Sequence, residues 1–163
     1  VLNVDHGYIG SPDRFEWIPG ARDAIRAVNR RGWYAFVVTN QSGIARGYFT
    51  EDDYRALDRH IRNELAAVGA HLDDVRHCPW LPDATVPEYR CDHPWRKPRS
   101  GMLLDLLAVW PVDVGRSFLI GDKPGDVEAA NGAGIPGHLF AGGDLAAFLA
   151  DRFAETASAP EPR

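Results

Sequence analysis

The hydrophobic positions of the chain alternate between two spacings, one typical of helices and one typical of buried strands. In residues 21–31 the apolar side chains recur every third or fourth position, which predicts a helix with one buried face. Residues 33–38 are a continuous apolar run, the pattern of a strand that is covered on both faces. The polar, glycine-containing segment 39–49 that follows is predicted to be a loop.

The same two spacings continue to the end of the chain and define its fold class. They predict further helices over 50–69, 102–110, 126–133 and 144–153, and further strands over 74–78, 117–120 and 137–140. Thr50 and Asp53 have the spacing of a helix capping box. Strands that alternate with helices form parallel sheets with helices on both faces, so we predict a Rossmann-like α/β fold. We expect one domain over residues 1–153 and a disordered tail over 154–163, which lacks apolar content.

Composition and charge narrow the classes of partner. The 163 residues have a formal net charge of −5, which argues against nucleic acid or an anionic membrane as the main partner. No apolar run approaches the roughly 20 residues that span a bilayer. Two cysteines, Cys78 and Cys91, are too few for a disulfide scaffold, and no export signal is visible. We therefore expect a cytoplasmic protein.

Polar residues follow three of the predicted strands or precede the helices between them, where open α/β sheets bind ligands. In the segment TNQSG at 39–43, a hydroxyl and the N–H groups of a glycine-containing turn could hold a phosphate. Arg96 and Lys97 precede a predicted helix, where their charges oppose the helix dipole and suggest a bound anion. Asp122 closes a hydrophobic strand, and Mg²⁺ takes one or two such carboxylates with water and phosphate oxygens.

Each of these residues also has a purely structural alternative. An ordinary turn would explain the segment 39–43, and a solvated surface position would explain the basic pair as well as Arg46, which could otherwise reach a second anionic group. Asp126 lies one helical turn after Asp122. It could be a second metal ligand, a partner for Lys123 or the cap of the following helix. The residues alone leave these choices open.

Taken together and in this order, the polar segments resemble the haloacid dehalogenase superfamily of phosphotransferases, and within it the D-glycero-D-manno-heptose 1,7-bisphosphate 7-phosphatases. The resemblance extends from Val1 to about Phe140 and rests on NVDHGY at 3–8, TNQSGIARG at 39–47, RKP with GML at 96–103, and GDK at 121–123. The related histidinol-phosphatase branch has an acidic residue after TNQ and lacks IARG. Ser42 and Arg46 therefore favour the heptose branch.

The resemblance implies a monomeric, Mg²⁺-dependent phosphatase without a large cap domain, acting on a small sugar phosphate in the synthesis of lipopolysaccharide precursors. It implies catalytic roles for Thr39, Lys97 and Lys123, with Asp122 and Asp126 at the metal. The substrate contacts that it implies are Asp5, His6, Gly7, Tyr8, Asn40, Gln41, Ser42, Arg46 and Arg96.

The resemblance also raises the question of the nucleophile. In the family, an aspartyl-phosphate forms on the first residue of an Asp-x-Asp-Gly strand that precedes the position of Val1, and the 163 residues contain no Asp-x-Asp pair. We therefore expect the chain as written to have almost no phosphatase activity. Asp5 is a rival nucleophile because it follows an apolar run, but no carboxylate lies two residues on, and DHGY matches the substrate loop of the family. A histidinol-phosphate phosphatase and a non-catalytic sugar-phosphate-binding protein are the alternatives.

The chain departs from the family a second time, at a zinc motif. Zinc-binding members have Cys-x-His and then Cys-x-Cys before the Arg-Lys pair. Here Trp80 and Trp95 stand at two of those four positions, and tryptophan cannot bind zinc. The alternative is an improvised set of His77, Cys78, Cys91 and His93. Packing of tryptophan and proline in the loop 79–100 fits the residues better, so we expect Mg²⁺ and no Zn²⁺.

Overall fold

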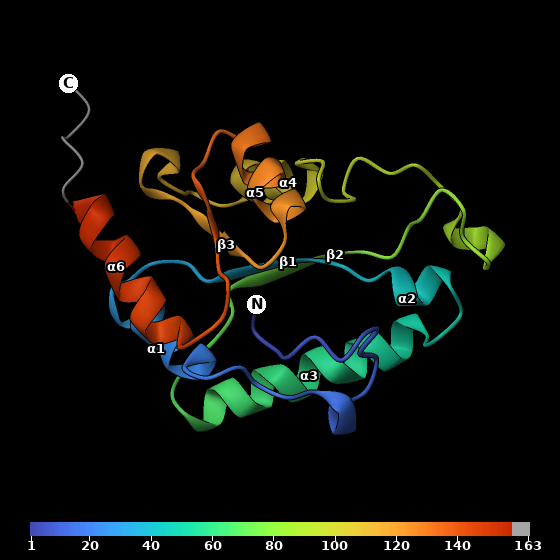
Figure 1. The fold of residues 1–163 in the computed structure, drawn as a ribbon, viewed down its shortest axis with the longest axis horizontal. Coiled ribbons are helices and arrows are strands. Elements are labelled where there is room, and N and C mark those ends of the chain that lie inside the picture. Colours follow the sequence, from blue (N-terminus) through green and yellow to red (C-terminus); the bar gives the residue numbers. More distant parts are fainter. Residues whose placement is uncertain (158–163) are drawn as a thin grey trace.

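The computed structural model of the chain describes residues 1–157 and arranges short parallel strands between layers of helices (Figure 1). Its elements are η1 (Pro12–Arg14), α1 (Ala21–Arg30), β1 (Phe36–Asn40), α2 (Ser42–Ala45), α3 (Glu51–Ala67), β2 (Asp74–Cys78), η2 (Pro87–Tyr89), α4 (Gly101–Val109), η3 (Val114–Arg116), β3 (Leu119–Gly121), α5 (Pro124–Gly132), β4 (Gly137–Leu139) and α6 (Leu145–Ala157). The α/β fold class predicted from the sequence is confirmed, and residues 1–157 include no inserted cap domain.

The strands form two separate parallel pairs. β1 pairs with β2 from Phe36 opposite Asp74 to Asn40 opposite Cys78. β3 pairs with β4, beginning with Leu119 opposite Gly137. Within the described residues β1 and β3 do not pair with each other, so the predicted sheet is interrupted between them.

A large apolar cavity follows this interruption. It has a volume of about 1230 Å³ and is lined by Phe36 and Val38 on the β1 side and by Phe118 and Ile120 on the β3 side. Side chains of α1, α3, α4 and α6 also reach it. The interruption therefore leaves a large, partly open space between the two strand pairs.

Helices cover both sides of the strands. In Figure 1, α4 and α5 lie above the strands, and α1 and α3 lie below them. Ala24 of α1 packs in one apolar cluster with Leu149 of α6, and Leu103 of α4 packs in another with Ala129 of α5. These two clusters fix the helices on the flanks of the strand pairs.

The first strand begins and ends later than its apolar run predicts. β1 begins at Phe36 rather than Trp33, because the Trp33 ring packs against Phe118 and Phe153 instead of joining the sheet. It continues through Asn40, which was predicted to lie in the loop, because pairing with β2 extends to that residue. The predicted loop also contains the short helix α2, whose Gly43, Ile44 and Ala45 are buried.

The later elements differ from prediction by a few residues at their ends. The capping box of Thr50 and Asp53 at the start of α3 is confirmed. Helix α5 begins at Pro124, two residues early, since proline is favoured in the first helical turn. Helix α6 continues to Ala157, so the first residues of the predicted disordered tail are helical. Residues 158–163 of that tail lie outside the described residues, and the predicted domain boundary stays a prediction.

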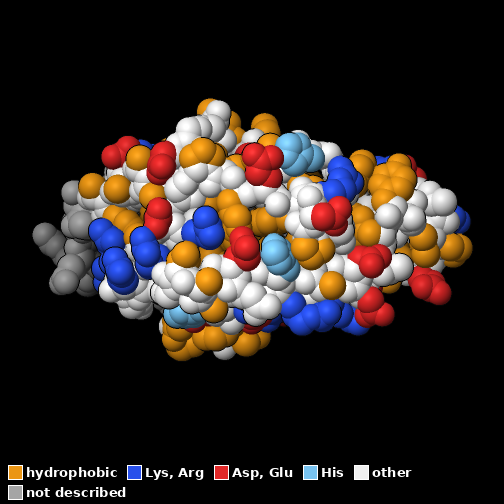
Figure 2. All heavy atoms as spheres, turned by 90° about the horizontal axis from the view of Figure 1, so that it is seen from below, with side chains coloured by type: hydrophobic (Ala, Val, Ile, Leu, Met, Phe, Trp, Pro, Cys, Tyr) orange, Lys and Arg blue, Asp and Glu red, His pale blue; other side chains and the backbone are white. Residues whose placement is uncertain are grey.

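The face seen in Figure 2 carries acidic and basic side chains that are interspersed with apolar ones. No extended area of a single sign covers this face. None of the helices in the described part of the chain is long and apolar enough to cross a membrane.

Candidate active site

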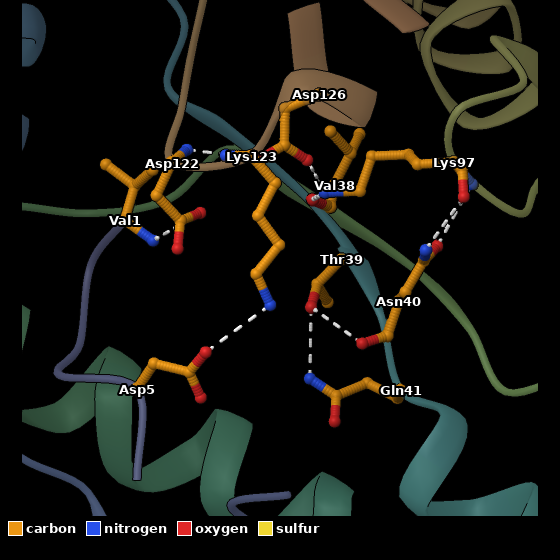
Figure 3. Close-up of polar contacts among 10 residues, drawn as sticks. All are labelled: Val1, Asp5, Val38, Thr39, Asn40, Gln41, Lys97, Asp122, Lys123 and Asp126. Atoms are coloured by element: carbon orange, nitrogen blue, oxygen red, sulfur yellow. Dashed lines mark hydrogen bonds and ion pairs between the residues drawn. The ribbon is translucent and has the colours of Figure 1, made fainter. Parts of the chain in front are cut away.

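The three polar strand ends identified in the sequence come together in the structure. Thr39, Lys97 and Asp122 all line the cavity at the carboxyl ends of β1 and β3. Figure 3 shows the Thr39 hydroxyl near the centre, with Lys97 and Asp122 above it and Asp5 below it. A phosphate in this space would have a hydroxyl donor, an ammonium group and a carboxylate around it.

Lys97 is fixed from both its backbone and its side chain. Its N–H donates to the Asn40 side-chain oxygen at 3.1 Å, and its carbonyl accepts from the Asn40 amide nitrogen at 3.1 Å. Its ammonium group donates to the Val38 carbonyl at 2.9 Å and lies 2.6 Å from the Asp126 carboxylate. Asn40 thus positions Lys97, and its predicted contact with substrate stays a prediction.

Asp126 is the buried anion of the site. One carboxylate oxygen faces Lys97, and the other accepts the N–H groups of Asp122 at 3.1 Å and Lys123 at 3.0 Å. Burial disfavours its charge, but Lys97 and these two donors outweigh burial and hold the pKa of Asp126 below its ordinary value. A side chain at Gly121 would overlap the Asp126 side chain, so glycine is required there. These contacts make Asp126 a helix cap and the partner of Lys97; metal ligation by it stays a prediction.

Asp122 presents the more accessible carboxylate. Its side chain is 39% exposed, and Oδ1 lies 3.6 Å from the Val1 nitrogen (Figure 3). A hard cation such as Mg²⁺ fits this donor, since it takes one or two carboxylates and completes its shell with water and phosphate oxygens. Among residues 1–157, no three His, Cys, Asp or Glu side chains gather closely enough to enclose an ion by themselves. Any ion on Asp122 would therefore need ligands from elsewhere.

Lys123 and Asp5 close the opposite side of the space. The Lys123 ammonium group donates to Asp5 Oδ2 at 3.3 Å, and both side chains are largely exposed. The Gly7 N–H donates to Asp5 Oδ1 at 3.0 Å. This hydrogen bond and Lys123 lower the pKa of Asp5. Asp5 is therefore held at the mouth of the site by its own turn and by Lys123.

The segment Asp5–Tyr8, here called the substrate loop, lies at the mouth of the site. Its His6 ring lies 2.7 Å from the Glu16 carboxylate. The Tyr8 ring meets the Tyr48 ring edge-on at 4.9 Å, and the Arg46 guanidinium lies 5.7 Å from the centre of the Tyr8 ring. The contact between Tyr8 and Arg46 thus joins the segments 3–8 and 39–47, which the sequence analysis identified separately.

The remaining predicted contacts lie just after β1 and in the loop 79–100. The Gln41 amide donates to the Thr39 hydroxyl at 3.1 Å, which orients that hydroxyl. Ser42 begins α2 and also lines the cavity. The Arg96 guanidinium donates to the Trp80 carbonyl at 3.4 Å while lining the same cavity. Their contacts with a substrate stay predictions.

The loop 79–100 is organised by aromatic stacking. The His93 ring stacks on Trp80 with centroids 4.0 Å apart, and His93 Nδ1 accepts the Trp95 N–H at 3.1 Å. Cys78 is buried, and burial raises the pKa of its thiol. The His77 ring faces the Glu51 carboxylate at 3.0 Å. The four side chains of the improvised zinc set thus have other partners or, for Cys91, an exposed position.

Two contributors to this region have no signal in the sequence. The Val38 carbonyl binds the Lys97 ammonium group, but every residue has a carbonyl, so only the fold reveals this contact. Arg14 donates to three carbonyls of the substrate loop from a turn that resembles ordinary surface. No spacing rule links Arg14 to that loop.

Comparison with known proteins places this geometry in a family. The family model for HAD-hydrolase-like proteins matches residues 94–160. The chain is 52% identical over 151 residues to a D-glycero-beta-D-manno-heptose-1,7-bisphosphate 7-phosphatase of Rhodopseudomonas palustris, covering 91% of this chain and 83% of that protein. It is 42% identical over 137 residues to the enzyme of the same name from Escherichia coli K12, covering 83% of this chain and 71% of that protein.

A solved structure agrees with these relatives. The fold matches D,D-heptose 1,7-bisphosphate phosphatase from B. bronchiseptica, crystallised with magnesium and phosphate, with a TM-score of 0.79 and 30% identity. The match covers 99% of this chain and 84% of that one. With the identity and coverage of the sequence relatives, it establishes that the chain belongs to the D-glycero-beta-D-manno-heptose-1,7-bisphosphate 7-phosphatase family of HAD-like hydrolases.

Proposed function

We propose that the protein removes the 7-phosphate from D-glycero-D-manno-heptose 1,7-bisphosphate through an aspartyl-phosphate. The observation that carries the proposal is the convergence of Thr39, Lys97 and Asp122 on one cavity, in a chain of this family. An ammonium group and a hydroxyl there can stabilise the equatorial oxygens of a transferring phosphoryl group. The polar surroundings match a phosphate better than an uncharged ligand.

The nucleophile would lie on a strand that fills the interruption between β1 and β3. Leu119 and Gly121 of β3 bond toward β4, through Leu119 N to Pro136 O and Phe140 N to Gly121 O. Because backbone groups of a parallel strand alternate in direction, those of Phe118 and Ile120 face the interruption. Unpaired strand edges readily accept another strand, and the apolar cavity has room for one.

A strand that fills the interruption in the parallel direction would end where β1 and β3 end. It would therefore place its last residues beside Asp122, opposite Thr39. These are the positions at which the resemblance sets the Asp-x-Asp-Gly pair.

The reaction then has two steps. In the first, a carboxylate oxygen of the first strand aspartate bonds to phosphorus while the bond from phosphorus to the sugar oxygen breaks, and the second aspartate gives its proton to that oxygen. In the second step, the second aspartate takes a proton from water. The water oxygen bonds to phosphorus while the bond from phosphorus to the first aspartate breaks, which releases inorganic phosphate. Thr39 and Lys97 hold the phosphoryl oxygens in both steps.

Asp122 would hold Mg²⁺ together with the strand carboxylates. When bound, such an ion neutralises repulsion between a carboxylate nucleophile and the phosphate. Lys123 would be drawn to the phosphate from its present pairing with Asp5. The substrate loop and the basic residues Arg46 and Arg96 would shape the rest of the pocket, since a guanidinium can bind a second phosphate bidentately.

A substrate comparison on the full-length protein tests this function. We expect Mg²⁺-dependent release of one phosphate from heptose 1,7-bisphosphate and a much lower kcat/KM for histidinol phosphate, because that molecule has no second phosphate for the arginines. Arg46→Ala should reduce this preference, because it should lower kcat/KM for the bisphosphate and leave kcat/KM for histidinol phosphate unchanged. Equal or better turnover of histidinol phosphate would contradict the substrate assignment. Cytoplasmic location and a monomeric state stay predictions.

A further inference from the structure

Arg14 holds the substrate loop through three consecutive carbonyl groups. Its guanidinium nitrogens donate to the carbonyls of His6 at 3.0 Å, Gly7 at 3.1 Å and Tyr8 at 3.3 Å. Arg14 ends the short turn η1 and reaches back to the loop across six to eight residues of the chain. A planar guanidinium with five donors can serve several acceptors at once, which a lysine ammonium cannot do with the same geometry.

The loop has a backbone that requires such support. Gly7 has φ of +68° and Tyr8 has φ of +43°, and the left-handed conformation is unfavourable for tyrosine. The tight turn also directs three carbonyl dipoles toward one point, where their negative ends repel one another. The positive charge of Arg14 sits at that point and removes the repulsion. The hydrogen bond from Gly7 N–H to Asp5, at 3.0 Å, closes the other side of the turn.

Tyr8, the residue with the unfavourable backbone conformation, packs against the predicted binding residue Arg46. The Tyr8 ring lies under the Arg46 guanidinium, 5.7 Å from ring centre to the central carbon, and packs on Tyr48 at 4.9 Å. Within the described residues, the buried Nε of Arg46 has no hydrogen-bond partner. No hydrogen bond fixes that nitrogen, so packing on the Tyr8 ring contributes to the direction of the guanidinium. A change in the Tyr8 backbone would move the surface on which Arg46 rests.

We propose that Arg14 is a positioning residue that fixes the substrate loop and, through Tyr8 and Arg46, sets the affinity for the second phosphate of the substrate. Arg14 itself touches neither the substrate nor the reacting atoms. The proposal rests on the proposed function, because it assigns the second phosphate to Arg46. It predicts an effect on binding of bisphosphates and little effect on the chemical step.

The test compares Arg14→Ala, Arg14→Lys and the control Arg59→Ala in the full-length protein. Arg59 is an exposed arginine of α3, so its removal changes the charge equally. We expect Arg14→Ala to raise KM for heptose 1,7-bisphosphate about tenfold, equivalent to about 1.4 kcal/mol, with kcat within about twofold. Turnover of p-nitrophenyl phosphate, which has no second phosphate, should change little. Arg14→Lys should recover part of the loss, and Arg59→Ala should match the wild type.

Hydrogen exchange of a peptide covering residues 3–10 gives an independent readout. Faster exchange in Arg14→Ala than in Arg59→Ala, together with the KM effect, supports the proposal. An unchanged KM overturns it, as does an equal loss on both esters, which would show a general role in folding. If the wild type does not hydrolyse the bisphosphate at all, the proposed function fails. Unchanged hydrogen exchange in Arg14→Ala shows separately that Arg14 does not hold the loop.

Discussion

The Lys97 ammonium group and the Asp126 carboxylate form a buried ion pair of 2.6 Å beneath the space proposed for the phosphate. Only 16% of the Lys97 side chain and 9% of the Asp126 side chain are exposed. The pair joins the end of the loop 79–100 to the start of α5, and Val38 attaches the same ammonium group to β1. The Lys97 side chain thus connects β1, the loop 79–100 and α5 through these two contacts.

Removing the lysine should harm both activity and stability. We expect Lys97→Met to lower kcat/KM on the bisphosphate by at least about 100-fold, as for loss of a transition-state donor. It should also lower the free energy of unfolding by about 3 kcal/mol, because Asp126 is left buried and unpaired. Adding Asp126→Asn should recover much of the stability but no activity. Urea unfolding of both variants checks this, and a double variant as unstable as the single one would contradict the pairing.

Acid should weaken the protein partly through Asp126. Its pKa is lowered in the folded state despite burial, mainly by Lys97, so below the ordinary value of 3.8 the unfolded state binds the proton more readily. The contribution of ionised Asp126 to the free energy of unfolding is therefore present above pH 3.8. It is lost as the pH falls through the lowered pKa of the folded state. Asp126→Asn should start less stable near neutral pH and lose less stability on acidification. Parallel curves of unfolding free energy against pH for the two proteins would rule out this contribution.

Asp122→Asn should act on the metal dependence. We expect the Mg²⁺ concentration for half-maximal turnover to rise by about tenfold or more, with a lower maximal rate, because a neutral amide is a poorer ligand for a hard cation. Asp151→Asn on α6 is the control, since Asp151 is an exposed carboxylate distant in sequence from the strand ends. A Mg²⁺ titration of turnover distinguishes them. An unchanged titration in Asp122→Asn would remove Asp122 from the metal site.

Aromatic packing rather than zinc should stabilise the loop 79–100. We expect Trp80→Ala to lower the free energy of unfolding by about 2 kcal/mol, because it removes the stack on His93. Treatment of the wild type with a zinc-selective chelator should leave its Tm unchanged. Metal analysis of the purified protein is the companion measurement. Stoichiometric zinc, or a lower Tm after chelation, would favour the set of His77, Cys78, Cys91 and His93 instead.

Local patterns predicted most of the elements correctly. The capping box of Thr50 and Asp53 and the buried face of α1 around Ala21 and Ala24 are confirmed. The start of β1 was misplaced because Trp33 extends an apolar run but packs on Phe118 and Phe153. An apolar run shows that residues are buried, but it does not show whether sheet or side-chain packing buries them.

The site was predictable in its parts but not in its connections. Thr39, Lys97 and Asp122 were identified as phosphate and metal residues from strand ends and from the family resemblance, and the structure places them on one cavity. The resemblance assigns Asn40 to the substrate, which stays a prediction, but it gives no sign that the Asn40 amide binds the backbone of Lys97. Such a contact joins residues 57 positions apart and depends on how β1 meets the loop, so no local pattern encodes it.

The central claim is that Thr39, Lys97 and Asp122 surround a single phosphate opposite a strand that fills the interruption between β1 and β3. A crystal structure of the full-length protein with Mg²⁺ and orthovanadate tests it most directly. We predict vanadate within hydrogen-bonding distance of the Thr39 hydroxyl and the Lys97 ammonium group, Mg²⁺ on Asp122, and an acidic strand paired with both β1 and β3. Vanadate bound away from these three side chains, or an interruption left without a strand, would contradict it.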